Sequence, residues 1–148
     1  VTSAVEGVPR ARDVQLTVAS DAAAYVLRGQ AQATAQALRG ILKNALQASP
    51  AGKPVEVEAK LSADGARCRI AVRDRGAGMS QEVLSRAGEP FFTTKEPGEG
   101  MGLGLFLTRV VAERVGGQLD LQSELGQGTT ATLTLPIAQR ATNHRTPA

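Results

Sequence analysis

Two pairs of alternating segments constrain the fold of this 148-residue chain more than any other feature. The first pair is PVEVEAKL (54–61) and RCRIAVRD (67–74), separated by the turn sequence Ala-Asp-Gly. The second pair is QLDLQS (118–123) and TTATLTLP (129–136). Apolar residues at every second position are typical of strands with one buried face, and short connections make successive strands antiparallel. The sequence therefore predicts two antiparallel hairpins.

The other patterned segments add short strands and helices. VQLTVA (14–19) alternates as a strand, and YVLRG (25–29) is a second short candidate. Residues 31–49 have helical periodicity and stop before Pro50, since a residue before proline disfavours helical backbone. The sequence of residues 75–99, interrupted by glycines and prolines, predicts one long loop. A loop of this length is usually either a functional lid or a disordered segment. We expect an α/β (α+β) two-layer sandwich, with a mostly antiparallel mixed sheet and helices on one face.

Composition indicates one globular domain. The chain is 42% hydrophobic and 21% charged, which is typical of folded proteins. We expect a linker tail at 1–12, the domain at 13–137 and a disordered tail at 138–148. The absence of Trp, with only one Tyr and three Phe, argues against an aromatic nucleic-acid platform, and the net charge of +3 is small and dispersed. Without a long apolar run or signal peptide the chain is expected to be soluble, and one cysteine fits a reducing cytoplasm.

The segment GEGMGLGLFLTRVVAERVGG (98–117) combines a helix with a glycine-rich start. Its apolar residues recur at helical spacing, at Leu103, Phe106, Leu107, Val110, Val111 and Val115. Its first half carries Gly98, Gly100, Gly102 and Gly104. Each glycine within a helix costs roughly 0.5–1 kcal/mol relative to alanine. Free N–H groups and the positive end of a helix dipole are the ingredients of a phosphate site. No strand immediately precedes Gly98, so the segment is a poor dinucleotide fingerprint.

A carboxylate stands in line with the core face of the second predicted strand. Asp74 shares the parity of Cys68, Ile70 and Val72, and an apolar setting is costly for a carboxylate without a partner. The glycines of the following DRGAGM stretch let backbone and ligand approach closely. Asp74 either accepts a hydrogen bond from an exocyclic amine such as that of adenine, or caps a turn at the strand end. Cys68 itself is interpreted as a small core hydrophobe rather than a redox sensor.

The helix at 31–49 carries two stripes. The apolar stripe, expected in the core, consists of Leu38, Leu42, Ala45 and Ser49, flanked by Ile41 and Leu46. The second stripe sets the small residues Ala37, Gly40 and Ala48 around Asn44. A carboxamide oxygen with several waters suits Mg²⁺. The alternative is close packing of another element against this flat face.

Five motifs occur in one order along residues 14–136. They are LKNALQAS with Asn44, DRGAGM with Asp74, EPFFTTK with Phe91 and Phe92, GMGLGL with Gly102 and Gly104, and GQGTT with Gly126, Gly128 and Thr129. Together they resemble the catalytic ATP-binding domain of bacterial sensor histidine kinases, of the superfamily that includes gyrase, the large heat-shock chaperone and mismatch-repair ATPases. The lid is most similar to the nitrogen-regulation type. The resemblance implies the left-handed ATP-binding (Bergerat) sandwich.

The resemblance also implies a role for each matching position. Asn44 would bind the Mg²⁺ that bridges the ATP phosphates, Lys95 would contact phosphate beside it as the second catalytic residue, and Asp74 would accept a hydrogen bond from adenine. For Lys95 the alternative is a solvated loop lysine, and for Phe91 and Phe92 a hydrophobic anchor of the lid. The remaining implied nucleotide contacts are Gly76, Gly78 and Met79, then Phe92 and Thr94 of the lid, the backbone of Gly102, Leu103, Gly104 and Leu105, and Thr129 near the adenine.

Two positions depart from the resemblance. The family usually has a second polar residue four positions before Asn44, where this chain has Gly40, so either water replaces that side chain or Mg²⁺ binding is weaker. The only histidine, His144, lies in the patternless tail and is interpreted as a bystander. The chain is therefore expected to be a fragment that binds Mg-ATP but phosphorylates itself poorly or not at all.

The implied function is transfer of the γ-phosphoryl group to a histidine on a separate dimerisation domain, with a response regulator downstream. We expect a monomeric cytoplasmic domain, whose full-length protein is cytoplasmic or anchored in the inner membrane, and no nucleic-acid partner. Two alternatives stay open. A nucleotide-binding module without kinase output is compatible with Gly40, and an anti-sigma-type serine kinase would leave acid-stable rather than acid-labile label on its product.

Overall fold

The computed structural model describes residues 13–18, 25–27, 31–98 and 102–140. In chain order the elements are β1 (Val14–Val18), β2 (Tyr25–Leu27), α2 (Ala31–Ala48), β3 (Val55–Leu61), β4 (Arg67–Arg73), α3 (Gln81–Arg86), α4 (Gly104–Arg114), β5 (Gln118–Glu124) and β6 (Gly128–Arg140). The bounds of β1 and α2 agree with the predicted segments to within one residue. None of the helices in these ranges is long and apolar enough to cross a membrane.

The strands form one mixed sheet. Its order is β1-β3-β4-β6-β2, and β5 pairs with β6 as well. β1 and β3 are parallel, because the chain passes through α2 between them, and every other pairing is antiparallel. Both predicted hairpins are present, as β3–β4 and β5–β6, and the mostly antiparallel mixed sheet is confirmed.

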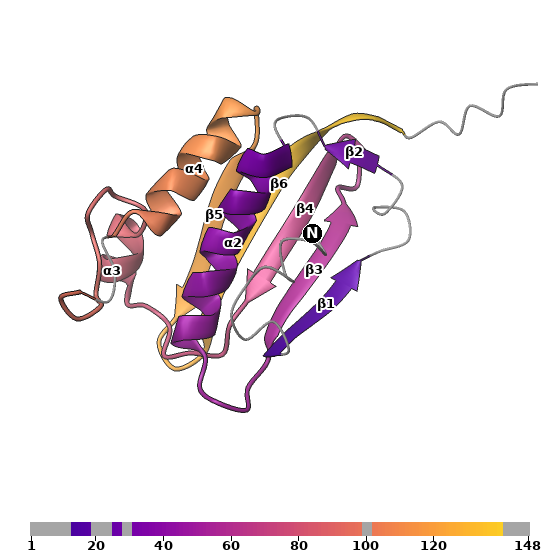
Figure 1. Ribbon diagram of the computed structural model, residues 1–148. Helices are drawn as coiled ribbons and strands as arrows, with labels where there is room; N and C mark the ends of the chain where they lie inside the picture. Colours follow the sequence, from indigo (N-terminus) through magenta and orange to yellow (C-terminus); the bar gives the residue numbers. More distant parts are fainter. Residues whose placement is uncertain (1–12, 19–24, 28–30, 99–101, 141–148) are drawn as a thin grey trace, which may run out of the picture.

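The helices cover one face of this sheet, with α2 lying over the strands and α4 beside it (Figure 1). The alternation of the strands decides which residues face them. In β4, for example, Cys68, Ile70 and Val72 are buried and the flanking arginines are exposed. The core also takes the predicted apolar stripe of α2, where Leu42 has no exposed surface. The two-layer sandwich is therefore confirmed.

The face by which α4 is buried differs from its most apolar stripe. Its buried residues are Thr108 and Ala112, whereas Leu107 is 52% exposed. The reason is that α4 packs against the small residues of α2, so its own small side chains occupy the contact. The Thr108 hydroxyl lies 2.9 Å from the carbonyl oxygen of Gly104 and 3.2 Å from that of Ala37 on α2.

Two predictions about connecting segments were wrong. The loop at 75–99 contains the helix α3, which Ser80 caps by accepting a hydrogen bond from the Val83 N–H at 3.2 Å. One and a half turns without a buried side chain leave no hydrophobic period to detect. The predicted tail from 138 onward begins too early, because β6 continues to Arg140, where it pairs with Tyr25 of β2. His144, the rest of that tail, Gly100 and the tail at 1–12 lie outside the described residues.

Candidate functional site

A cavity of about 890 Å³ lies between α2, the loop after β4, the segment after α3 and the start of α4. Its volume is in the range of small-molecule sites. The cavity lining includes every residue that the sequence assigned to nucleotide or metal binding except Gly76. Five motifs far apart in the chain therefore converge on one cavity, although nothing in their spacing alone required it.

Asp74 lies at one end of the cavity, directly after β4, and is only 6% exposed. Its Oδ1 accepts hydrogen bonds from the backbone N–H groups of Gly76, at 2.9 Å, and Thr129, at 3.2 Å. Burial raises the pKa of the Asp74 carboxyl, and these two bonds oppose that effect. Within the described residues Oδ2 accepts no hydrogen bond. The turn-capping interpretation of Asp74 is thus confirmed through Oδ1, and the binding of an exocyclic amine stays a prediction that this geometry leaves open.

The glycines around Asp74 serve approaches of the protein's own backbone. A Cβ at Gly78 would lie under 3.0 Å from the carbonyl oxygen of Glu124, and one at Gly128 would collide in the same way with the carbonyl oxygen of Asp74. Gly76 is pressed against the backbone of Ala48 in α2. The expected close approach of backbone is present at all three glycines, where the contacting atoms belong to other segments of the same chain, and the approach of a ligand stays a prediction. Gly76 is buried and does not line the cavity.

A cluster of amide oxygens around a cation lies at the other end. The ammonium group of Lys95 donates to Asn44 Oδ1 at 3.2 Å and to Gln47 Oε1. Lys95 is thus not a solvated loop lysine. The sequence interpretation missed Gln47, although it follows Asn44 by three positions and helical spacing places the two on one face.

The start of α4 closes this end of the cavity. Leu103 is the N-cap residue and makes no side-chain capping bond, so the N–H groups of the first turn have no capping side chain. Gly104 lies so close to Asn44 that an added Cβ would be 3.5 Å from Nδ2. Backbone donors and the amide of Asn44 therefore lie side by side, an arrangement suited to a phosphate and its cation.

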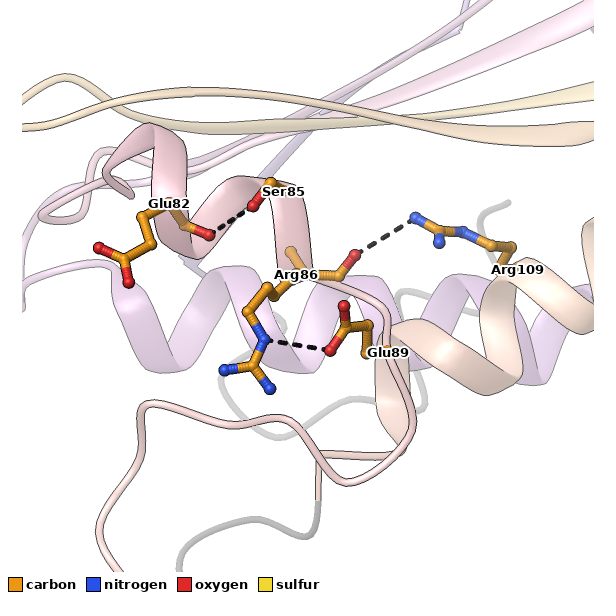
Figure 2. A network of polar contacts seen from close by, with 6 residues as sticks. Glu82, Ser85, Arg86, Glu89 and Arg109 are labelled. Carbon is orange, nitrogen blue, oxygen red and sulfur yellow. Dashed lines mark hydrogen bonds and ion pairs between the residues drawn. The ribbon is translucent and has the colours of Figure 1, made fainter.

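A network of polar contacts joins α3, the segment after it and α4 (Figure 2), and that segment lines the cavity with Ala87, Gly88 and Phe92. Arg86 pairs with Glu89, Nε to Oε2 at 3.1 Å, and its guanidinium lies 4.3 Å from the centroid of the Phe92 ring. Arg109 of α4 donates to the carbonyl oxygen of Ala87 at 3.3 Å. The two phenylalanines of the motif diverge. Phe92 lines the cavity, whereas the Phe91 side chain is 71% exposed. Phe91, with φ +65°, instead contacts the segment before α4 through its backbone, where its N–H donates to the carbonyl oxygen of Gly102 at 3.0 Å.

The sequence profile of a family described as "Histidine kinase-, DNA gyrase B-, and HSP90-like ATPase" matches residues 29–139. The chain is 40% identical to "Sporulation kinase E" of Bacillus subtilis (strain 168), over 74% of the chain and 14% of that protein. It spans less than a third of the curated relatives that it matches.

Two solved structures resemble the fold. "ShkA full-length in complex with AMPPNP" gives a TM-score of 0.76 at 25% identity, over 95% of this chain and 30% of that one. "Mycobacterial sensor histidine kinase MprB" gives 0.74 at 25% identity, over 85% of each chain. These likenesses confirm the predicted fold class.

Proposed function

Because the chain belongs to the family of histidine kinase-, DNA gyrase B- and HSP90-like ATPases, we propose that it binds Mg-ATP and donates the γ-phosphoryl group to a histidine. That histidine would lie on a dimerisation domain of the same protein, and a response regulator would take the phosphoryl group from it, in the cytoplasm. The observation that carries the proposal is one cavity with a carboxylate acceptor at one end and, at the other, a lysine bound by two amide oxygens beside a helix start. Named relatives are sensor and sporulation kinases, which supports this assignment.

The adenine end follows from Asp74. Its Oδ2 accepts no bond from the described residues, and an acceptor on a largely buried side chain in the cavity wall favours a ligand that carries a donor. The exocyclic amine of adenine is such a donor. Met79 and Leu121 add apolar walls for a planar base. Binding would offset part of the cost of burying this carboxylate.

The phosphate end follows from the start of α4. The backbone at Gly102, Leu103, Gly104 and Leu105 would donate to phosphate oxygens, and Lys95 would turn its ammonium from Asn44 to phosphate. The donor set also fits Mg²⁺, since Asn44 and Gln47 already direct amide oxygens at a cation. Mg²⁺ takes few protein ligands and would neutralise charge on the phosphates. The chain's part in transfer is to hold the γ-phosphate for an in-line acceptor.

Gly40 favours one alternative, a nucleotide-binding module without kinase output. The position four residues before Asn44 carries no side chain, and Thr108 fills part of the adjacent space, 3.4 Å from where a Cβ would be. This module would bind ATP but leave an intact acceptor domain unlabelled.

The test begins with calorimetric titration of the chain with ATP and AMPPNP, with and without Mg²⁺. An Asp74→Asn variant is compared with Asp120→Asn, which changes an exposed carboxylate on β5. We expect saturable binding that Asp74→Asn abolishes and Asp120→Asn retains. A folded wild-type chain that binds no nucleotide would overturn the proposal.

The second step supplies labelled ATP and the dimerisation domain of a related sensor kinase. Acid-labile label on that domain supports histidine transfer. Acid-stable label on a partner protein indicates a serine kinase, and ATP binding without any transfer favours the regulatory module.

A further inference from the structure

We infer that Ser123 is a positioning residue that sets the base preference of the site, by fixing the direction in which the Thr129 hydroxyl presents its lone pairs. The inference rests on the proposed nucleotide function and adds a residue to it. Ser123 does not line the main cavity, and Thr129 does. Ser123 would therefore act through Thr129 rather than by touching the base.

The Ser123 hydroxyl is the centre of a three-way junction at the end of β5. Its oxygen accepts a hydrogen bond from the backbone N–H of Met79 at 2.8 Å, on the loop after Asp74. It lies 3.0 Å from the carbonyl oxygen of Gly128 and 2.8 Å from the Thr129 hydroxyl oxygen, both on β6. One side chain thus joins the two segments that form the adenine end of the cavity.

Counting protons assigns a direction to each bond. A serine hydroxyl has one hydrogen and two acceptor lone pairs. A carbonyl oxygen only accepts, so the bond to Gly128 uses the Ser123 hydrogen. The bond between the two hydroxyls then uses the hydrogen of Thr129. With the Met79 N–H as the second donor to Ser123, the hydroxyl has its full complement of three bonds.

These bond directions determine what the Thr129 hydroxyl can offer a ligand. Its only hydroxyl hydrogen points at Ser123, so this hydroxyl offers the cavity lone pairs alone. Asp74 offers an acceptor as well, because both backbone donors to its carboxylate fall on Oδ1. This end of the cavity is thus matched to a base with an exocyclic amino group and mismatched to a base with a carbonyl oxygen there. A site that matches hydrogen bonds rejects the analogue that cannot make them.

Removing the Ser123 hydroxyl would remove the constraint on the orientation of the Thr129 hydroxyl. In Ser123→Ala the Thr129 hydroxyl is free to rotate and donate into the cavity, so a carbonyl oxygen is accepted better and an amino group less well. We expect the affinity ratio of ATP to inosine triphosphate, which has a carbonyl oxygen in place of the amino group, to fall about 3- to 10-fold, the equivalent of one hydrogen bond. Ser123→Thr keeps the hydroxyl and should restore the ratio.

The experiment titrates both nucleotides, with Mg²⁺, into wild type, Ser123→Ala, Ser123→Thr and Thr129→Val. Thr130→Val is the matched control, because its side chain lies on the opposite face of β6. Circular dichroism melts establish that each variant is folded. Adding Ser123→Ala to Thr129→Val should change the ratio no further, since Ser123 acts through that hydroxyl.

A Ser123→Ala protein that loses affinity for both nucleotides equally would show that Ser123 only supports the fold, and would overturn the inference. The inference would also be overturned if Ser123→Ala shifted the ratio of ATP affinity to inosine triphosphate affinity equally with and without the Thr129 hydroxyl. Should Ser123→Ala not fold, Ser123→Cys replaces it, because a thiol is a weak acceptor and should lower the ratio in the same direction. Failure of the proposed function is recognised separately, since wild type would then bind neither nucleotide.

Discussion

At the scale of the single residue, Asp74 combines a cost in stability with the binding role proposed for it. Its carboxylate is buried, and burial raises its pKa from the ordinary value of 3.8. The folded state therefore binds the Asp74 proton more tightly than the unfolded chain. It follows that the contribution of this group to stability is greatest below pH 3.8 and is lost as the pH rises through the raised pKa.

We predict that Asp74→Asn is at least as stable as wild type at pH 7.5 yet binds no ATP. The amide keeps an acceptor for Gly76 and Thr129 but carries no charge to desolvate, and its NH₂ would face the donor of the base. Thermal melts should show the advantage of the variant shrinking as the pH falls toward 3.8. A variant less stable than wild type at neutral pH would contradict this prediction.

A second prediction separates two costs of replacing a glycine. One is the cost of a left-handed backbone conformation, and the other is the collision of the added Cβ with neighbouring backbone. Gly78 and Gly65 have nearly the same φ, +70° and +69°, but a Cβ at Gly78 meets Glu124 and one at Gly65 meets nothing within 4 Å. Gly65→Ala should cost about 1–2 kcal/mol, the price of the left-handed conformation alone. Gly78→Ala should cost clearly more and abolish ATP binding, as measured by urea denaturation and titration. Equal losses for the two variants would mean that the loop moves aside freely.

At the scale of the element, the site depends on how α4 packs against α2. The small residues of α2 divide between two tasks that the sequence interpretation treated as alternatives. Ala37 and Gly40 face Thr108 of α4, and Gly40 also lines the cavity together with Asn44, one turn further on. Because the start of α4 lies against Asn44, this packing sets the spacing between the amide and the backbone donors.

We predict a coupled pair at this contact. Gly40→Ala should stabilise the chain by up to about 1 kcal/mol, since glycine is a poor helix former and the added Cβ would meet Thr108 Oγ1 at 3.4 Å. In Gly40→Asn the larger side chain would enter space that the Thr108 side chain occupies. We therefore expect this variant to destabilise the folded chain by about 1–3 kcal/mol. Thr108→Ala in the same chain should recover part of that loss. Urea denaturation of wild type, Gly40→Asn, Thr108→Ala and the double variant measures the coupling between the two positions. Strictly additive changes in the free energy of unfolding would refute it.

At the scale of the whole molecule, one long strand connects the adenine end of the site to most of the sheet. β6 is shared by β4, β5 and β2, so Thr129 at its start and the edge pairing near Arg140 belong to one strand. Ligand binding at one end of the sheet and the start of α4 should therefore stabilise the domain as a unit.

This predicts a thermal shift that depends on the metal. Mg-ATP at 100 times its dissociation constant should stabilise the folded chain by about 2.7 kcal/mol, by mass action. Adding EDTA should remove most of that gain, because the phosphates would lose the cation at Asn44. Differential scanning calorimetry measures both, with EDTA alone as the control. An identical shift with and without Mg²⁺ would argue against the metal role of Asn44.

Local periodicity determined much of this protein by itself. The alternation of residues 67–74 decides that Asp74 shares the buried face of β4, and helical spacing decides that Asn44 stands beside the core stripe of α2. Both follow from backbone geometry within a few residues. The ordered motifs added the family, and with it the expectation that Asp74 and Asn44 bind one ligand.

The tertiary structure alone decided what depends on distant partners. α3 has no period of its own, β6 reaches Arg140 only because β2 pairs with it, and α4 buries Thr108 because α2 offers small residues there. Ser123 continues the inward face of Leu119 and Leu121 in β5, but its type and position do not reveal its partners, because its three bonds exist only where the loop after Asp74 meets the β5–β6 hairpin. Such contacts are set by packing between segments, and local patterns hold no information about it.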